Sequence, residues 1–332
     1  MKILITGGNG FIGTALTDHF LSQGAEVTVF DRATPQPELT AHFQQLPGRF
    51  QAHAGDIRDS DAVAAAFGSG PWDLVVHAAV ITADRERERR DAKTIMDVNM
   101  MGTMTVLDIL RHVPVTRAIY VSSASVYGEA AFDAGALDES ANRPVPDSLY
   151  AISKYACERA WLRFDGLTQA DLRTVRLGSA YGPFERRTGL RDTMSPPFQI
   201  MEAHLTGKPA TMPRDALRDW IYTRDITGAI EKLATAGDPR HRVFNLGLGE
   251  NLPISAFCRG LEAVTPAFSW SVETAADRAT VNLHGDRDRS MLAVDRLTRD
   301  LGYTPSWTPE RAAADYQSWQ QANPGLRSIM FD

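Results

Sequence analysis

Three glycines close to the N-terminus constrain this chain more than any other feature. Gly7, Gly10 and Gly13 join a short apolar run, residues 2–5, to a segment with apolar residues at helical spacing, residues 14–23. In a buried strand that turns sharply into a helix, the first glycine allows the turn, the second lets a ligand approach the backbone, and the third lets the helix pack close to the strand. The pattern therefore predicts a strand–turn–helix unit that binds the diphosphate of a dinucleotide.

An acidic residue ends the next predicted strand. This strand covers residues 26–30, and Asp31 follows it about twenty residues after the glycines. A carboxylate at this place bonds the adenosine ribose diol of NAD and repels the extra phosphate of NADP, although the adjacent Arg32 weakens that discrimination. We therefore expect NAD as the cofactor, with Phe11 and Ile12 at its phosphates. The alternative is a flavodoxin-like first turn that binds no dinucleotide.

Length, charge and cysteine content limit the class of protein. A chain of 332 residues holds one large α/β domain or two smaller ones, and a net charge of −6 argues against a nucleic-acid or anionic membrane partner. Cys157 and Cys258 lie far apart without metal-ligand spacing, so we expect reduced core thiols, no metal site and a cytoplasmic location. The first residues do not resemble a signal peptide, and no apolar run is long enough to cross a membrane.

Further apolar runs alternate with amphipathic segments along the chain. This alternation predicts an α/β fold with a Rossmann-type, doubly wound parallel sheet and a smaller C-terminal substrate-binding region. In such a sheet, ligands bind at the carboxyl ends of the strands. The additional strands are expected at residues 49–54, 72–76, 117–121, 172–177 and 243–246.

Polar and small residues follow two of these strands. Asp56 and Ile57 come after the third strand, where Asp56 either caps the next helix or reaches the adenine amino group of the cofactor, two interpretations that we hold equal. Ala78 and Ala79 follow the fourth strand, and their small side chains let the backbone pass against the cofactor. We expect His77, directly before them, to be a packed or hydrogen-bonded histidine rather than a catalyst.

A tyrosine and a lysine lie one turn apart at the start of a predicted helix. Tyr150 and Lys154 are i and i+4 neighbours, and Ser123 stands in a hydroxyl-rich segment after the fifth strand. A tyrosine titrates at about 10, but a lysine ammonium and a bound nicotinamide cation both lower the pKa of its phenol. We therefore expect Tyr150 to take a proton from a substrate hydroxyl while the cofactor takes hydride from the same carbon.

In their order and spacing, these residues resemble the extended short-chain dehydrogenase/reductase family, and within it the NDP-sugar epimerase/dehydratase group that includes UDP-glucose 4-epimerase. The resemblance covers nearly the whole chain and implies Tyr150 as the acid/base, Ser123 as the partner of the reacting oxygen, and Lys154 at the nicotinamide ribose. It also implies a cofactor contact for Asn99. Further matching motifs are Val126-Tyr127-Gly128, Tyr181-Gly182-Pro183, Arg218-Asp219-Trp220-Ile221-Tyr222, Asn245-Leu246-Gly247 and Gly285-Asp286-Arg287.

The resemblance also implies a division of the chain and a partner. It predicts an NAD-binding domain, a substrate-binding region with a lid, and a homodimer formed through two helices. The NAD-binding domain is expected at 1–177 with a returning segment at about 219–246, the substrate-binding region at 178–218 and 247–332 with its lid at 184–197, and the dimer helices at 95–112 and 150–165.

Two departures from the family pattern bear on the reaction. Sugar dehydratases of the family carry Asp-Glu directly after the catalytic hydroxyl residue, where this chain has Ala124 and Ser125, so we do not expect elimination of water. An Asn that bonds the substrate in the family is replaced by Ser179, which favours a substrate other than a nucleotide sugar. We expect Ser179, Ser123 and Thr82, which follows the fourth strand, to border the substrate.

Arginines in the second half favour an anionic substrate. The irregular lid carries Arg186, Arg187 and Arg191, whose forked guanidinium groups suit a phosphate or a carboxylate, although an exposed loop arginine is an equal interpretation for each. In the resemblance, Arg218 and Arg287 point to the diphosphate of an NDP-sugar. A carboxylate of a sugar acid satisfies the same arginines.

We therefore expect an NAD-dependent enzyme that acts on a secondary alcohol of a carbohydrate-like anion, foremost an NDP-sugar 4-epimerase. The alternative is an NAD-dependent dehydrogenase of a free sugar or of a sugar or hydroxy acid, whose carboxylate the lid arginines would hold. A remote alternative is a non-catalytic dinucleotide sensor on the same fold. An epimerase leaves NAD unchanged after a turnover, whereas a dehydrogenase accumulates NADH.

Overall fold

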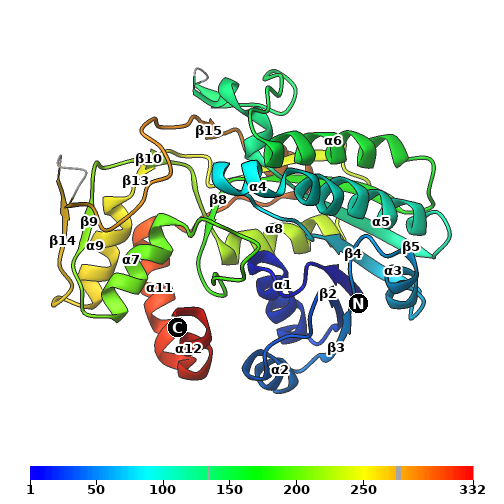
Figure 1. Ribbon diagram of the computed structural model, residues 1–332, viewed down its shortest axis with the longest axis horizontal. Coiled ribbons are helices and arrows are strands. Elements are labelled where there is room, and N and C mark those ends of the chain that lie inside the picture. The colour runs from blue at the N-terminus through cyan, green and yellow to red at the C-terminus, as the bar shows by residue number, and fades with distance from the viewer. Residues whose placement is uncertain (133–134, 274–277, 332) are drawn as a thin grey trace.

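A computed structural model describes residues 1–132, 135–273 and 278–331 (Figure 1). A seven-stranded sheet forms its centre, and all strand pairs in that sheet are parallel. Its strands are β1 (Lys2–Thr6), β2 (Glu26–Asp31), β3 (Arg49–Ala54), β4 (Trp72–His77), β5 (Val115–Ser123), β7 (Asp171–Leu177) and β12 (Val243–Leu246). The spatial order β12-β7-β5-β4-β1-β2-β3 reverses direction at β1, which opens a crevice between β1 and β4. The predicted Rossmann-type fold is confirmed.

Helices cover both faces of the sheet, which explains why its inner strands are apolar on both sides. One face carries α1 (Phe11–Ser22), α2 (Pro37–Gln44), α8 (Thr223–Thr235) and α10 (Asp295–Leu301), and the other carries α3 (Ser60–Phe67), α5 (Gly102–Leu110) and α6 (Leu149–Phe164). Each face has a core of its own. Leu16 and Ile230 meet on the first face, and Leu107 and Trp161 on the second.

The charged run before residue 95 is helical. Asp84 caps helix α4 (Arg85–Met96) by accepting the backbone N–H of Arg87, and α4 continues through a π-helical turn, Asp97–Met101, into α5. The helix that we expected from residue 95 therefore begins about ten residues earlier.

The smaller region packs around a separate core that includes Trp220, Phe257 and Tyr316. Its helices are α7 (Pro196–Leu205), α9 (Ser255–Val264), α11 (Pro309–Ala322) and α12 (Pro324–Phe331). Its short strands pair as β8 (Ser179–Tyr181) with β11 (Trp220–Tyr222), β9 (Ala210–Met212) with β14 (Trp270–Val272), and β10 (Leu217–Arg218) with β13 (Leu252–Pro253). A last pair, β6 (Ala136–Leu137) with β15 (Met291–Leu292), lies beyond β12. Within the described ranges, no helix is both long and apolar enough to cross a lipid bilayer.

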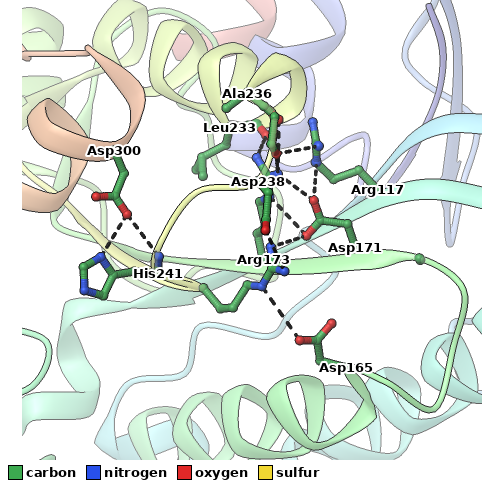
Figure 2. A network of polar contacts seen from close by, with 12 residues as sticks. Arg117, Asp165, Asp171, Arg173, Leu233, Ala236, Asp238, His241 and Asp300 are labelled. Atoms are coloured by element: carbon green, nitrogen blue, oxygen red, sulfur yellow. Dashed lines mark hydrogen bonds and ion pairs between the residues drawn. The ribbon is translucent and has the colours of Figure 1, made fainter.

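A buried ionic network closes the amino end of the sheet (Figure 2). The Asp171 carboxylate accepts from Arg117 Nε at 3.1 Å and from Arg242 Nη1 at 2.8 Å. Arg173 donates Nε to the same carboxylate at 3.2 Å and Nη1 to the Leu233 carbonyl at 2.6 Å. The last carbonyls of α8 thus accept hydrogen bonds from guanidinium groups. These bonds satisfy the carbonyls that have no partner within the helix and place positive charge at the negative end of the helix dipole.

The helix after β3 is capped by a different aspartate from the one considered in the sequence. Asp59 accepts the backbone N–H groups of Asp61 at 3.0 Å and Ala62 at 3.2 Å. Asp56 instead accepts Arg58 Nε at 2.9 Å, and this contact lowers the pKa of its carboxyl. The capping interpretation of Asp56 is therefore wrong, and its contact with adenine stays a prediction.

Candidate active site

A cleft of about 800 Å³ lies at the carboxyl ends of the central strands, toward the upper end of the range for small-molecule sites. Segments that are far apart in sequence form its walls: the glycine-rich turn, the ends of β2 to β5, the start of α6, the lid and β10. The predicted residues that line it are Gly7, Gly10, Phe11, Ile12, Gly13, Asp31, Arg32, Asp56, Ile57, Ala78, Ala79, Thr82, Ser123, Tyr150, Lys154, Ser179, Arg186, Arg191 and Arg218.

The turn after β1 has the geometry that its glycines predicted. Gly7 has a φ of +72°, and a Cβ there would lie 2.6 Å from the backbone nitrogen of Ala79. A Cβ on Gly13 would lie 2.2 Å from the Gly7 carbonyl oxygen, so α1 can pack against the turn only because this side chain is missing. No described side chain caps α1, which begins after Gly10 and leaves its first N–H groups for an anion. This cradle fits the diphosphate of NAD.

Asp31 braces the same turn from the end of β2. Its carboxylate accepts the backbone N–H of Asn9 at 2.9 Å and that of Arg32 at 2.7 Å. Burial raises the pKa of Asp31, and both hydrogen bonds oppose that shift. Each oxygen keeps a lone pair, so the carboxylate can still accept from a ribose diol.

Tyr150, at the start of α6, lines the same cleft as Ser123 and Thr82. Burial raises the pKa of the Tyr150 phenol, while Ser123, Arg191 and Thr82 lower it. Our expectation that Lys154 lowers the pKa of this phenol is wrong for the protein alone. Lys154 Nζ instead donates to the Val121 carbonyl at 2.6 Å, and burial lowers its pKa to about 8.

A buried polar network supports the strand end that carries Ser123. Neighbouring Ser122 donates to Glu158 at 3.0 Å, and Glu158 pairs with Arg176 at 2.6 Å. Arg176 Nη1 donates to the Tyr127 hydroxyl at 2.9 Å, which in turn donates to Asn245 at 2.9 Å. Tyr127 and Asn245, noted in the sequence as matching motifs, therefore hold the scaffold beneath the cleft.

His77 is a packed histidine, as expected. Its Nδ1 lies 2.6 Å from the Thr6 hydroxyl and its Nε2 lies 3.0 Å from the Thr103 hydroxyl. Burial, with a smaller effect of the Lys154 charge, lowers the pKa of His77 to about 3. The imidazole is therefore neutral at ordinary pH.

Asn99 lies behind the cleft wall rather than on it. Its Oδ1 accepts the Ile81 N–H at 2.8 Å, and its Nδ2 donates to the Ile81 carbonyl at 3.1 Å and to the Ser153 hydroxyl at 3.0 Å. The side chain thus ties the segment after β4 to α6, and the predicted cofactor contact of Asn99 stays a prediction.

The lid, residues 184–197, is fastened to the segment after β4. Thr82 N donates to the Leu190 carbonyl at 2.8 Å, and Asp192 N donates to the Thr82 carbonyl at 3.2 Å. Arg87, on α4, adds bonds to the Gly189 carbonyl at 2.8 Å and to Asp192 at 3.0 Å. The lid therefore lies closed against the cleft.

Two of the predicted lid arginines lie at different places. Arg191 pairs with Glu185 at 3.2 Å, stacks over the Phe11 ring at 5.4 Å and acts on the pKa of Tyr150, so it lies on the catalytic side. Arg186 donates to the Asn9 carbonyl and, at 3.2 Å, to the Thr14 hydroxyl. Arg186 therefore lies at the glycine-rich turn, where the sequence had suggested a substrate contact.

Arg218 lines the cleft, whereas Arg287 does not. Arg218 Nη2 donates to the Leu283 carbonyl at 3.2 Å, but its buried Nε has no partner among the described residues, and burial lowers its pKa to about 10. Arg287 points to the surface, where it pairs with Glu129 at 3.4 Å. The structure does not bring Arg287 to the cleft, so its substrate contact stays a prediction, whereas Arg289, two residues later, lines the cleft.

The chain matches the model of the NAD dependent epimerase/dehydratase family over residues 3–247 and belongs to that family. It is an enzyme of the extended short-chain dehydrogenase/reductase type, and its cofactor is NAD.

Two curated relatives and one solved structure illustrate the similarity. The UDP-glucose 4-epimerase of Corynebacterium glutamicum is 26% identical over 327 residues, which covers 95% of this chain and 94% of the relative. The dTDP-glucose 4,6-dehydratase of Salmonella typhimurium is 26% identical over 355 residues, which covers 97% of this chain and 93% of the relative. The structure of UDP-glucose 4-epimerase with UDP-glucose from Thermotoga maritima shares the fold with a TM-score of 0.78 at 22% identity, covering 98% of this chain and all of the other (100%).

Proposed function

We propose that this enzyme is an NDP-sugar epimerase that inverts a secondary alcohol, foremost the one at C4 of the sugar. The observation that carries the proposal is that Tyr150 shares one cleft with Arg218, whose guanidinium has an unsatisfied nitrogen. Arg218 has a buried N–H without a partner, and Arg289 lines the same wall. A diphosphate would satisfy both with charge-assisted hydrogen bonds and would hold the sugar toward Tyr150.

The protein groups around Tyr150 suit reversible proton transfer. Tyr150 takes the proton of the sugar hydroxyl, and Ser123 and Thr82 hold the same oxygen in reach of the phenol. Lys154 is fixed beneath them by the Val121 carbonyl, where its ammonium can hold a ribose hydroxyl. When bound, NAD supplies the acceptor for the hydride and returns it at the end of the cycle.

The two residues after Ser123 separate this proposal from a dehydratase. Ala124 and Ser125 form a short 3₁₀ turn, and Ser125 N donates to Ser123 Oγ at 3.1 Å. Neither side chain is an acid or a base at neutral pH, so elimination of water would lack its proton carrier at this place.

A second candidate is an NAD-dependent dehydrogenase of a sugar acid. It is favoured by Arg191, which lies close enough to act on the Tyr150 phenol and suits a carboxylate on the reacting sugar. Ser179, which lines the cleft in place of the family's Asn, also fits this candidate.

The division of the chain and its assembly belong to the same proposal. We assign NAD binding to 1–177 with 219–246 and substrate binding to 178–218 with 247–332. The homodimer would form through α5 and α6, near which Met101 is 56% exposed and Ile152 is 41% exposed. The two cysteines are free and buried, which suits a reducing, cytoplasmic setting.

The test mixes purified protein and NAD with UDP-sugars, other NDP-sugars, free sugars and sugar acids. We expect a new sugar isomer by NMR without net absorbance at the NADH band. Tyr150→Phe should lose about 10²- to 10⁴-fold in turnover and still bind NAD. NADH that accumulates with a sugar acid would establish the dehydrogenase instead, and full turnover by Tyr150→Phe would remove Tyr150 from the mechanism.

A further inference from the structure

One lid arginine reaches the dinucleotide turn from the substrate side of the cleft. The Arg186 guanidinium is 7% exposed and donates to the Thr14 hydroxyl at 3.2 Å and to the Asn9 carbonyl. Asn9 lies inside the glycine-rich turn, and Thr14 lies in the first turn of α1. The guanidinium is therefore beside the helix N-terminus that receives the cofactor phosphates.

The charge of Arg186 lacks a close counterion in the protein. Both of its hydrogen-bond partners are neutral, and within the described ranges no carboxylate lies at ion-pair distance. Asp31 acts on it only from farther away, and burial lowers the pKa of Arg186 to about 10. The site is also the positive end of the α1 dipole, which disfavours a cation and favours an anion. An uncompensated guanidinium at this place is explained if an anion binds there.

We propose that Arg186 is a cofactor-binding residue, which clamps the diphosphate of NAD from the lid and so ties cofactor release to lid opening. The guanidinium has five N–H donors, of which two are used by Asn9 and Thr14, and a fork of this kind suits paired phosphate oxygens. Arg191, also on the lid, lies on the catalytic side of the cleft, close enough to Tyr150 to lower the pKa of its phenol. The proposal rests on NAD as the cofactor and not on the identity of the sugar.

This clamp has a consequence for turnover. The lid is bonded to Thr82 on the substrate side and to Asn9 on the cofactor side, so under this proposal the release of NAD requires these contacts of the lid to break. An enzyme that returns its hydride within one cycle has no need to exchange NAD between turnovers, whereas a dehydrogenase must release NADH each time. Slow NAD release would therefore fit the proposed epimerase.

The experiment measures NAD release directly, without a sugar. Protein loaded with NAD is mixed with excess NADH, and the rise of bound NADH fluorescence gives the release rate of NAD. We expect Arg186→Ala to release NAD about tenfold to 100-fold faster than the parent, the range for loss of a hydrogen bond to a charged group. Arg186→Lys keeps the positive charge but lacks the forked guanidinium, so its rate of NAD release should lie between those of the parent and of Arg186→Ala.

Arg187→Ala is the matched control, because Arg187 is the neighbouring lid arginine and pairs with Glu202 on α7 at 2.6 Å. Its NAD release should stay within about twofold of the parent. UDP serves as a probe of the sugar side, and its affinity at saturating NAD should be unchanged in Arg186→Ala. An unchanged NAD release in a folded Arg186→Ala protein would overturn the proposal, and a loss of UDP affinity alone would return Arg186 to the substrate. Neither readout needs turnover, so the clamp and the epimerase activity can fail separately.

Discussion

Arg173, at the amino end of the central sheet, and Arg218, at the carboxyl end, differ in how the protein satisfies their guanidinium groups. At the amino end, the fully buried Arg173 donates to the Asp171 carboxylate and to the Leu233 carbonyl at the end of α8 (Figure 2). At the carboxyl end, Arg218 Nη2 donates to the Leu283 carbonyl, but the buried Arg218 Nε has no partner among the described residues. The protein supplies partners for every guanidinium nitrogen of Arg173 but not for the Nε of Arg218.

The difference separates arginines that stabilise the fold from arginines that bind a ligand. A buried N–H without a partner costs about 1–3 kcal/mol, and more when it is charged, so a fold does not keep such groups for its own stability. The amino-end network contributes its full set of bonds during folding. The Nε of Arg218, in the cleft, would gain a partner when an anion binds there, and this new hydrogen bond would contribute to the affinity for the anion.

The largest expected effect is at the amino end. Arg173→Ala removes one partner of the partly exposed Asp171 and leaves the Leu233 and Ala236 carbonyls without this donor, so unfolding should become easier by about 3 kcal/mol. Denaturant unfolding of the parent and the variant measures this loss. NAD affinity well below the melting temperature should be unchanged, and a variant of parental stability would show that this network is dispensable.

Arg218→Ala should show the reverse pattern. Loss of a guanidinium that bonds the substrate diphosphate should raise KM for the NDP-sugar about 100-fold, because bonds to charged groups are strong in a partly buried site. Stability should be unchanged or slightly higher, since the variant removes a buried N–H without a partner. Steady-state kinetics and melting curves of one preparation decide this, and a large loss of stability with an unchanged KM would place Arg218 with the structural arginines.

The central sheet was predictable because its signals are local. Each inner strand is buried on both faces, so it appears as a continuous apolar run, and the glycines after β1 are required by steric contacts of the backbone itself. Errors arose at the ends. Strand β5 begins at Val115 rather than at residue 117, and α4 begins at Arg85 because Asp84 caps it.

The site was predictable where regular elements hold it and not where irregular segments do. Tyr150 and Lys154 share one face of α6, so their spacing alone brings them together. Arg186 is turned toward Asn9 by a lid whose path depends on bonds to Thr82, and no local pattern encodes that path. Asn99 was recognised as a site residue, but its buried contact with Ile81 depends on how two helices pack.

The smallest expected effect is at Arg287, a predicted substrate residue that lies outside the cleft. Arg287→Ala removes an exposed ion pair with Glu129 and a stack over Phe132. The free energy of unfolding should therefore change by no more than about 0.5 kcal/mol, and KM for the NDP-sugar should change little. Arg289→Ala, two residues away, should raise KM for the NDP-sugar about tenfold, because this side chain lines the cleft. Parallel kinetics of the two variants compare residues of one type on one irregular segment. A larger effect from Arg287 than from Arg289 would mean that this segment rearranges when the substrate binds. The arginines that bind the ligand would then have to be identified in the substrate-bound protein rather than in the protein alone.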